Sequence, residues 1–363
     1  MRVDTHCKTR GGGAFRGSTL CNIGWVETPR EVLIALARRY AFGDVAALAA
    51  GGLVPDHVAP GIEALCSFGQ RILDLDAEDF GMPETVGDSS AIPRRFMNRS
   101  RASRMPQTPR EQPRGALLSL RPAYALLLEV IEIRWLRRDL AALVAALHIA
   151  SEYLPLLAWE PVLGHAADPA LLGPAVSGPG SRFGVAPVPG EPRNCDHTRS
   201  ERSAVERALR VAAEPAEGWR SYLDRQHSIV SGALGVCAAE CRTPCSVVTG
   251  LAEDVRAGLA GSCKLALEFT AGALVRLRHA APVGHGFGVP SLEEVENAWA
   301  RTRTSLERQE PGRAALADAE EDPYPLPGLP GLFSAIAGAE ITPDTLLHDV
   351  AAHVVGILGR FPS

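Results

Sequence analysis

The sequence contains almost no lysine. Its two lysines, Lys8 and Lys264, stand against 35 arginines, while alanine, glycine, leucine and proline are abundant. This bias is typical of a coding genome rich in G and C, so we interpret it as genomic information that carries no functional meaning.

The chain also lacks an excess of positive charge. Its net charge at pH 7 is -5, which gives no overall attraction to nucleic-acid phosphates or to anionic membranes. Binding of nucleic acid would require a local basic patch. We therefore expect neither nucleic acid nor a membrane as a partner. A small-molecule ligand remains as the expected partner, and homo-oligomer formation stays open.

A hydrophobic run long enough to cross a membrane is not evident either. The longest apolar stretch, residues 140–151, lies between Asp139 and Glu152 and contains His148, whereas a membrane span needs about 20 apolar residues. The first residues show no apolar core of signal-peptide length. We therefore expect a cytoplasmic protein in which the eight cysteines are reduced and mostly buried.

Helical periodicity is the main signal that the sequence does contain. Hydrophobic residues make up 46% of the 363 residues, which is ample for a core. Apolar residues recur at steps of three and four in residues 29–50, 60–73 and 123–153, and no alternating run indicates a substantial sheet. The sequence predicts an all-α, bundle-like protein of about ten helices in two subdomains.

Segments rich in proline, glycine or charge suggest the boundaries between regions. We assign an N-terminal helical region to residues 1–92, an Arg/Pro-rich linker to 93–115, a long helix and hairpin to 116–172 and a Gly/Pro-rich loop to 173–197. A C-terminal helical subdomain is assigned to 198–310, an acidic proline-rich linker to 311–330 and a terminal helix to 331–363. Pro155 and Pro161 are expected to end the long helix.

The most chemical feature is a run of cysteines. Cys237, Cys241 and Cys245 recur at steps of four, which places the first two about one turn apart on one face of a helix. Pro244 cannot continue that helix, so Cys245 is expected to open the next one, where the helix dipole lowers the pKa of a thiol.

Together with Cys263, these residues predict a site for a soft metal or a metallocofactor, with zinc, copper, iron-sulfur and haem all left open. Their spacing departs from common zinc knuckles and from ferredoxin runs. The alternative is that small apolar cysteines fill a tight contact between helices.

A glycine-rich loop, residues 282–290, offers a second candidate site. Gly284, Gly286 and Gly288 leave the backbone accessible next to His285, and the loop leads to a helix expected to begin at Ser291, with Glu294 as its capping partner. Such an approach to a helix N-terminus can bind an anionic group, with His285 as an acid or base. An ordinary flexible connection is the alternative.

Three functional interpretations remain open. In the first, the chain binds a soft metal or metallocofactor through its cysteine-rich helical region, as an enzyme of specialised metabolism. The second is a metal-free helical enzyme that uses the His285 loop, and the third is a non-catalytic structural or assembly protein. Whether the protein is an enzyme is undecided. We adopt the first because only the cysteines offer clustered chemistry.

Overall fold

The computed structural model describes residues 28–76, 91–172, 219, 223, 229–242, 244–279 and 288–360. This part of the chain contains helices and no strand, which confirms the predicted all-α class. The helices are α1 (Pro29–Arg38), α2 (Phe42–Leu48), α3 (Ala59–Leu73), α4 (Arg94–Ser103), α5 (Arg121–Leu136), α6 (Leu140–Leu163), α10 (Ser231–Ala239), α11 (Ser246–Thr249), α12 (Glu253–Thr270), α13 (Ala273–Arg276), α14 (Leu292–Leu306), α15 (Glu310–Ala315), α16 (Leu329–Ala337) and α17 (Leu346–Leu358). Short turns of other helical types lie at Ala49–Leu53, Gly115–Leu117 and Leu277–His279.

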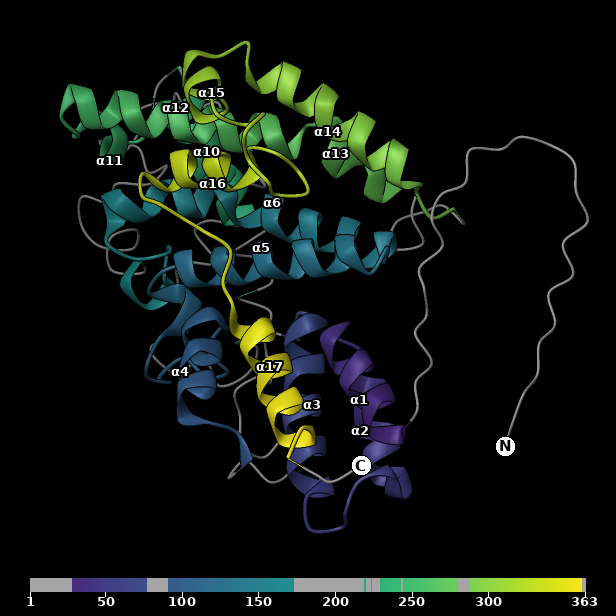
Figure 1. The fold of residues 1–363 in the computed structure, drawn as a ribbon. Helices are drawn as coiled ribbons and strands as arrows, with labels where there is room; N and C mark the ends of the chain where they lie inside the picture. The colour runs from purple at the N-terminus through teal and green to yellow at the C-terminus, as the bar shows by residue number, and fades with distance from the viewer. Residues whose placement is uncertain are drawn as a thin grey trace, which may run out of the picture.

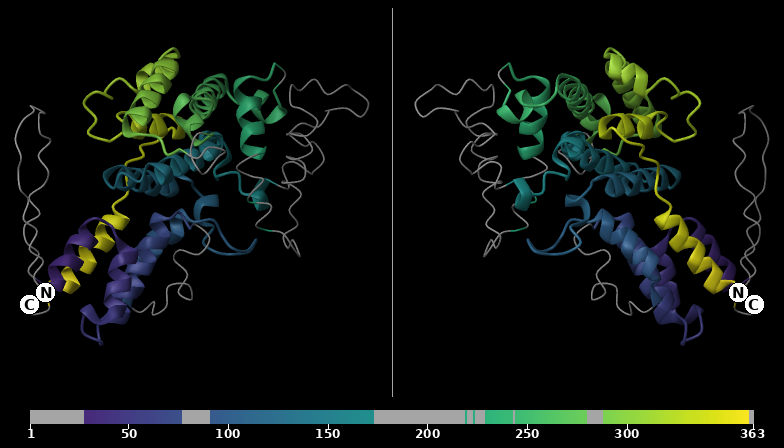
Figure 2. Two further views of the ribbon diagram at one scale, coloured as in Figure 1. Left: turned by 90° about the vertical axis from the view of Figure 1, so that its right-hand side faces the viewer. Right: turned by 90° about the vertical axis from the view of Figure 1, so that its left-hand side faces the viewer.

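The helices lie in three tiers, with α5 and α6 in the middle (Figure 1). Helices α10 to α16 lie on one side of this pair, and α1 to α4 lie on the other. The C-terminal helix α17 returns to the N-terminal helices and contacts α1 and α3, as the side views also show (Figure 2). One continuous hydrophobic core runs through all three tiers. The segment 331–363 does not form a single helix, because α16 lies in one outer tier and α17 in the other.

Side-chain caps explain where several helices begin. Thr28 caps α1, because its hydroxyl accepts the Glu31 N–H at 3.3 Å and the Glu31 carboxylate accepts the Thr28 N–H at 3.0 Å. The expected pair Ser291 and Glu294 forms the same reciprocal arrangement at α14. A capping box satisfies backbone donors that the first turn leaves without partners, so the prediction at Ser291 is confirmed.

The single long helix expected over residues 123–153 is two helices. The chain turns at Arg138, whose φ is 58°, and the Asp139 side chain then caps α6 by accepting the Ala142 N–H. The left-handed conformation interrupts α-helical geometry. Apolar periodicity continues across the turn because both helices face the same core, so periodicity alone could not locate the break.

Pro155 and Pro161 lie within α6 and do not end it, contrary to the prediction. Proline at 155 removes the N–H that would bond to the Ser151 carbonyl. The Thr270 hydroxyl of α12 lies 3.1 Å from that carbonyl, although it also lies 2.8 Å from Ala266 O. A neighbouring helix therefore supplies a donor where α6 lacks its own.

The predicted linker over residues 93–115 is wrong for the segment that forms α4. Phe96, Met97 and Ser100 are buried, and Arg99 forms ion pairs with Asp344 and Asp349. Arg99 looks like a residue of a solvated segment in the sequence, because its acidic partners lie about 250 residues away in the chain.

The predicted acidic linker over residues 311–330 is packed as well. It contains most of α15, and Tyr324 is buried with its hydroxyl donating to the Leu128 carbonyl at 2.8 Å. Asp322 accepts the N–H groups of Tyr324 and Gly328, at 2.9 and 2.8 Å. Prolines shape this segment into turns, but its apolar side chains still join the core.

Other helix boundaries also differ from the prediction. The terminal helix assigned to residues 331–363 is shorter than expected, since α17 follows its N-cap residue Thr345 and ends before its C-cap residue Gly359. Cys263 lies in the middle of α12. The predicted loop at 173–197 lies outside the described residues.

Within the part of the chain that the structure describes, two helices are long and apolar enough to cross a membrane, α6 and the segment Glu253–His279 that begins with α12. Of the most apolar stretch of each, 61% of the residues are buried in the first and 44% in the second. Contacts with α5, α10 and α12 surround α6, so its apolar composition has an explanation in the core of the fold.

Candidate functional site

The cysteine run lies where α10 ends and α11 begins. Cys237 belongs to α10, but that helix ends at Ala239 and Cys241 follows its C-cap residue Glu240. The Val236 carbonyl accepts the N–H groups of both Glu240 and Cys241, each at 2.9 Å. Cys241 is therefore outside the helix, and the prediction that Cys237 and Cys241 share one helical face is wrong.

Cys245 turns back toward Cys237. The Cys245 N–H donates to the Cys237 sulfur at 3.3 Å, and the Cys245 carbonyl accepts the N–H groups of Val248 and Thr249 in the first turn of α11. The expectation that Cys245 opens the next helix is thus confirmed. We refer to Cys237, Cys241 and Cys245 as the cysteine cluster.

Burial and the proximity of the other cysteines keep Cys237 protonated. The pKa of the Cys237 thiol is raised well above its usual value, first by a hydrogen bond with the Cys245 side chain and then by burial. The Cys241 side chain raises it further by charge repulsion. Cys237 is therefore a neutral thiol at physiological pH, and a metal ion would have to displace its proton.

Cys263 does not join the cluster electrostatically. It is fully buried in α12, and burial alone raises the pKa of its thiol to about 12. Cys66 in α3 has the same character, with a pKa of about 12. Across the described ranges, no group of three or more His, Cys, Asp or Glu residues is arranged to hold a metal ion, so the four cysteines are not preassembled as ligands of one ion.

The candidate loop site lies mostly outside the described residues. This applies to His285, Gly284 and Gly286, whereas Gly288 is exposed and Ser291 is the N-cap of α14. The Ser291 hydroxyl accepts the Glu294 N–H at 3.2 Å, and the Glu294 carboxylate accepts the Ser291 N–H at 2.7 Å. The chain's own side chains thus already use these groups at the N-terminus of α14.

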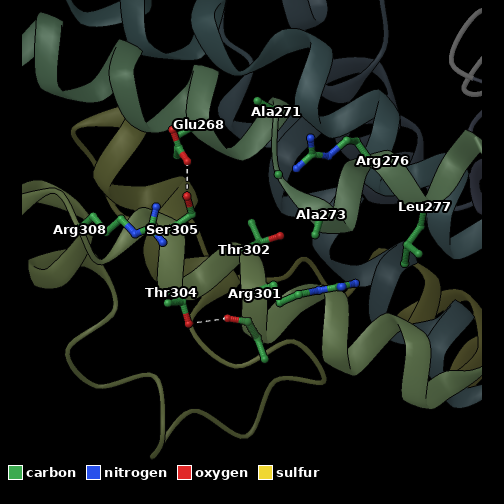
Figure 3. Close-up of a pocket in the computed structure, with 12 residues that line it drawn as sticks. Glu268, Ala271, Ala273, Arg276, Leu277, Arg301, Thr302, Thr304, Ser305 and Arg308 are labelled. Atoms are coloured by element: carbon green, nitrogen blue, oxygen red, sulfur yellow. Dashed lines mark hydrogen bonds between the residues drawn. The ribbon is translucent and has the colours of Figure 1, made fainter.

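Two adjacent clefts that we did not predict from the sequence flank the last turns of α12. The arginine cleft has a volume of about 750 Å³ and lies between the end of α12, α13 and α14 (Figure 3). Its charged lining residues are Glu268, Arg276, Arg301 and Arg308. The acidic cleft, of about 680 Å³, shares Glu268 with it and is lined also by Glu240, Lys264 and Glu310.

A sequence signal for the arginine cleft did exist. The first turn of α14 carries Glu293 and Glu294, whereas its later turns carry Arg301 and Arg303. Acidic residues in the first turn and basic residues in the later turns interact favourably with the helix dipole. The sequence alone does not show that α13 lies beside α14, so this pattern looks like that of an ordinary exposed helix. Comparison of the chain with protein-family models, with curated proteins and with solved structures found no match.

Proposed function

We propose that the protein binds a soft univalent metal ion, Cu(I), through the thiolates of Cys237 and Cys245. The observation that carries the proposal is the 3.3 Å contact between the Cys245 N–H and the Cys237 sulfur, which brings two cysteines eight residues apart into one site. Thiolates are preferred ligands of Cu(I), and an N–H donor to a sulfur stabilises its anionic form.

Ligand number favours Cu(I) over the other metals and cofactors that the sequence left open. Structural zinc sites and iron-sulfur clusters use four protein ligands, whereas two thiolates are sufficient for Cu(I). Cys241 is beside this pair, and Cys263 has no part in it. The proposal therefore retains the cysteine-rich region as the metal site and reduces its ligand set.

The surroundings of the cluster offer a route for a cation. Cys241 and Cys245 are 9% and 8% exposed, whereas Cys237 is 1% exposed, so the pair can be approached from the side of Cys245. Glu240, the residue before Cys241, lines the acidic cleft with Glu268 and Glu310. Carboxylates at this position raise the local concentration of cations.

Titration with Cu(I) under a reducing atmosphere, in competition with a chromophoric Cu(I) chelator, tests the proposal. We expect one tightly bound ion per chain and ultraviolet absorption from thiolate-to-metal charge transfer. Binding displaces the Cys237 proton, so the affinity should increase by at least about tenfold per pH unit between pH 6 and 8.

Alanine variants locate the site. Cys237→Ala and Cys245→Ala should each weaken Cu(I) binding at least 100-fold. Cys263→Ala and Cys66→Ala, which also remove a buried thiol, are the matched controls and should leave Cu(I) binding unchanged. Thermal melting of each variant confirms folding. Equal weakening by Cys263→Ala, or no saturable binding by the wild-type chain, would refute the proposal.

A further inference from the structure

The arginine cleft contains an excess of positive charge that the described residues of the chain do not neutralise. Arg276, Arg301 and Arg308 line the cleft, and all three are exposed. Their guanidinium groups form no hydrogen bond or ion pair with the described part of the chain. By contrast, Arg303 on the same helix pairs with Glu307 at 3.5 Å.

Three neighbouring elements supply the three arginines. Arg276 comes from the end of α13, Arg301 from α14, and Arg308 from the turn that follows α14. Figure 3 shows Arg276 and Arg301 on opposite sides of Ala273, with Arg308 beside Ser305. A helix dipole can explain basic residues at the end of one helix, but it does not explain why arginines of neighbouring elements border the same cleft.

Buried hydrogen bonds hold α13 and α14 together beneath the cleft. The Thr302 hydroxyl accepts the Leu274 N–H at 3.0 Å and donates to the Ala298 carbonyl at 2.9 Å. A Cβ added at Gly272 would lie 2.7 Å from the Thr302 methyl group, so glycine permits this close approach. The relative positions of Arg276 and Arg301 are therefore fixed by the fold.

Among the described residues that line the cleft, the one carboxylate is already engaged. Glu268 accepts a hydrogen bond from the Ser305 hydroxyl, at the wall that the arginine cleft shares with the acidic cleft. Three arginines and one glutamate give the described lining of the arginine cleft a formal charge of +2. Small residues such as Ala271 and Ala300 leave space between the charges, and Leu277 adds an apolar wall.

We propose that this cleft binds a small organic phosphate, with the phosphate group held by Arg276, Arg301 and Arg308. Guanidinium groups bind phosphate oxygens through paired hydrogen bonds. A volume of about 750 Å³ is in the range of small-molecule sites, and the apolar wall would contact the organic part. This site is separate from the cysteine cluster, so either can exist without the other.

Isothermal titration with inorganic pyrophosphate tests the anion site on the full chain. We expect saturable 1:1 binding that weakens as sodium chloride is raised. Arg276→Gln, Arg301→Gln and Arg308→Gln should each weaken binding at least fivefold, and the double variant of Arg276 and Arg301 should abolish it. Melting temperatures should stay unchanged, because these side chains are exposed.

Arg256→Gln is the matched control, since Arg256 is an exposed arginine of α12 outside both clefts. Its binding of pyrophosphate should equal that of the wild type. Equal weakening of pyrophosphate binding in Arg256→Gln would show that only the overall charge matters, and would overturn the proposal. A titration without saturable heat up to about 10 mM pyrophosphate would overturn it as well, since a specific site should bind more tightly than that.

Discussion

Glu129 of α5 should make the stability of this protein fall as the pH rises. Glu129 is 3% exposed. One of its carboxylate oxygens accepts the His348 N–H at 2.9 Å, and the other has no hydrogen-bond partner among the residues that the structure describes. Burial raises the pKa of Glu129 from 4.5 to about 8. The N–H groups of His348 and Leu347 and the charge of Arg99 lower this pKa, and Asp344 raises it, but burial dominates.

The direction of the pH effect follows from linkage. The folded state holds the Glu129 proton more tightly than the unfolded chain does, so between pH 4.5 and about 8 unfolding releases a proton. The stabilisation is complete below about pH 4.5 and is lost as the pH rises through about 8. At about 1.36 kcal/mol per pH unit, the loss is about 5 kcal/mol.

Glu129→Gln isolates this effect, because glutamine is neutral at every pH and its carbonyl oxygen can accept the same backbone N–H. Urea unfolding of wild type and variant at pH 5, 6, 7, 8 and 9 gives the difference in free energy of unfolding at each pH. The variant should gain stability relative to the wild type by about 4 kcal/mol between pH 5 and pH 9, because the part of the loss that falls below pH 5 lies outside this range. Glu132→Gln, on the same helix, controls for removal of a carboxylate.

Glu129→Gln also differs from the wild type by a pH-independent amount of unfolding free energy, which does not affect this test. We expect this amount to be small, because the amide nitrogen replaces an oxygen without a hydrogen-bond partner in the described part of the chain. The slope is what matters. A difference in unfolding free energy that stays flat from pH 5 to pH 9 would show that Glu129 is ionised in the folded protein, and the explanation from burial would be wrong.

Two backbone features give further predictions. Thr270→Val should destabilise the protein by about 1 kcal/mol relative to Thr270→Ser, because only serine keeps a donor for the Ser151 carbonyl; equal urea midpoints would contradict this. Gly115 has a φ of 53°, and an added Cβ would lie 2.2 Å from the Arg104 carbonyl oxygen. Gly115→Ala should therefore cost more than about 2 kcal/mol in urea unfolding, and an unchanged midpoint would contradict the close approach.

Local chemistry was predictable from the sequence where both partners lie within a few residues. The Ser291 cap of α14 and the opening of α11 at Cys245 are examples. The position of Cys241 relative to Cys237 was not predictable, because α10 ends two residues before Cys241. No pattern in the residues themselves marked that end.

Features that depend on distant partners could not be read from the sequence. The arginine-rich segment around Arg99 predicted a linker, because its partners Asp344 and Asp349 lie far away in the sequence. Pro155 predicted a helix end, because no neighbouring residue in the sequence replaces the missing N–H donor to the Ser151 carbonyl. The donor comes from the Thr270 hydroxyl of α12. The arginine cleft likewise requires α13 and α14 to be adjacent, and that adjacency depends on the contact between Gly272 and Thr302.

X-ray absorption at the copper edge of the Cu(I)-loaded protein identifies the ligands of the metal. We expect two sulfur neighbours around each copper ion in the wild type, and the same spectrum in Cys263→Ala. Cys237→Ala and Cys245→Ala should each remove the two-sulfur shell. A copper ion surrounded by nitrogen or oxygen, or a two-sulfur shell that survives in Cys237→Ala, would contradict the assignment of Cys237 and Cys245 as the metal ligands.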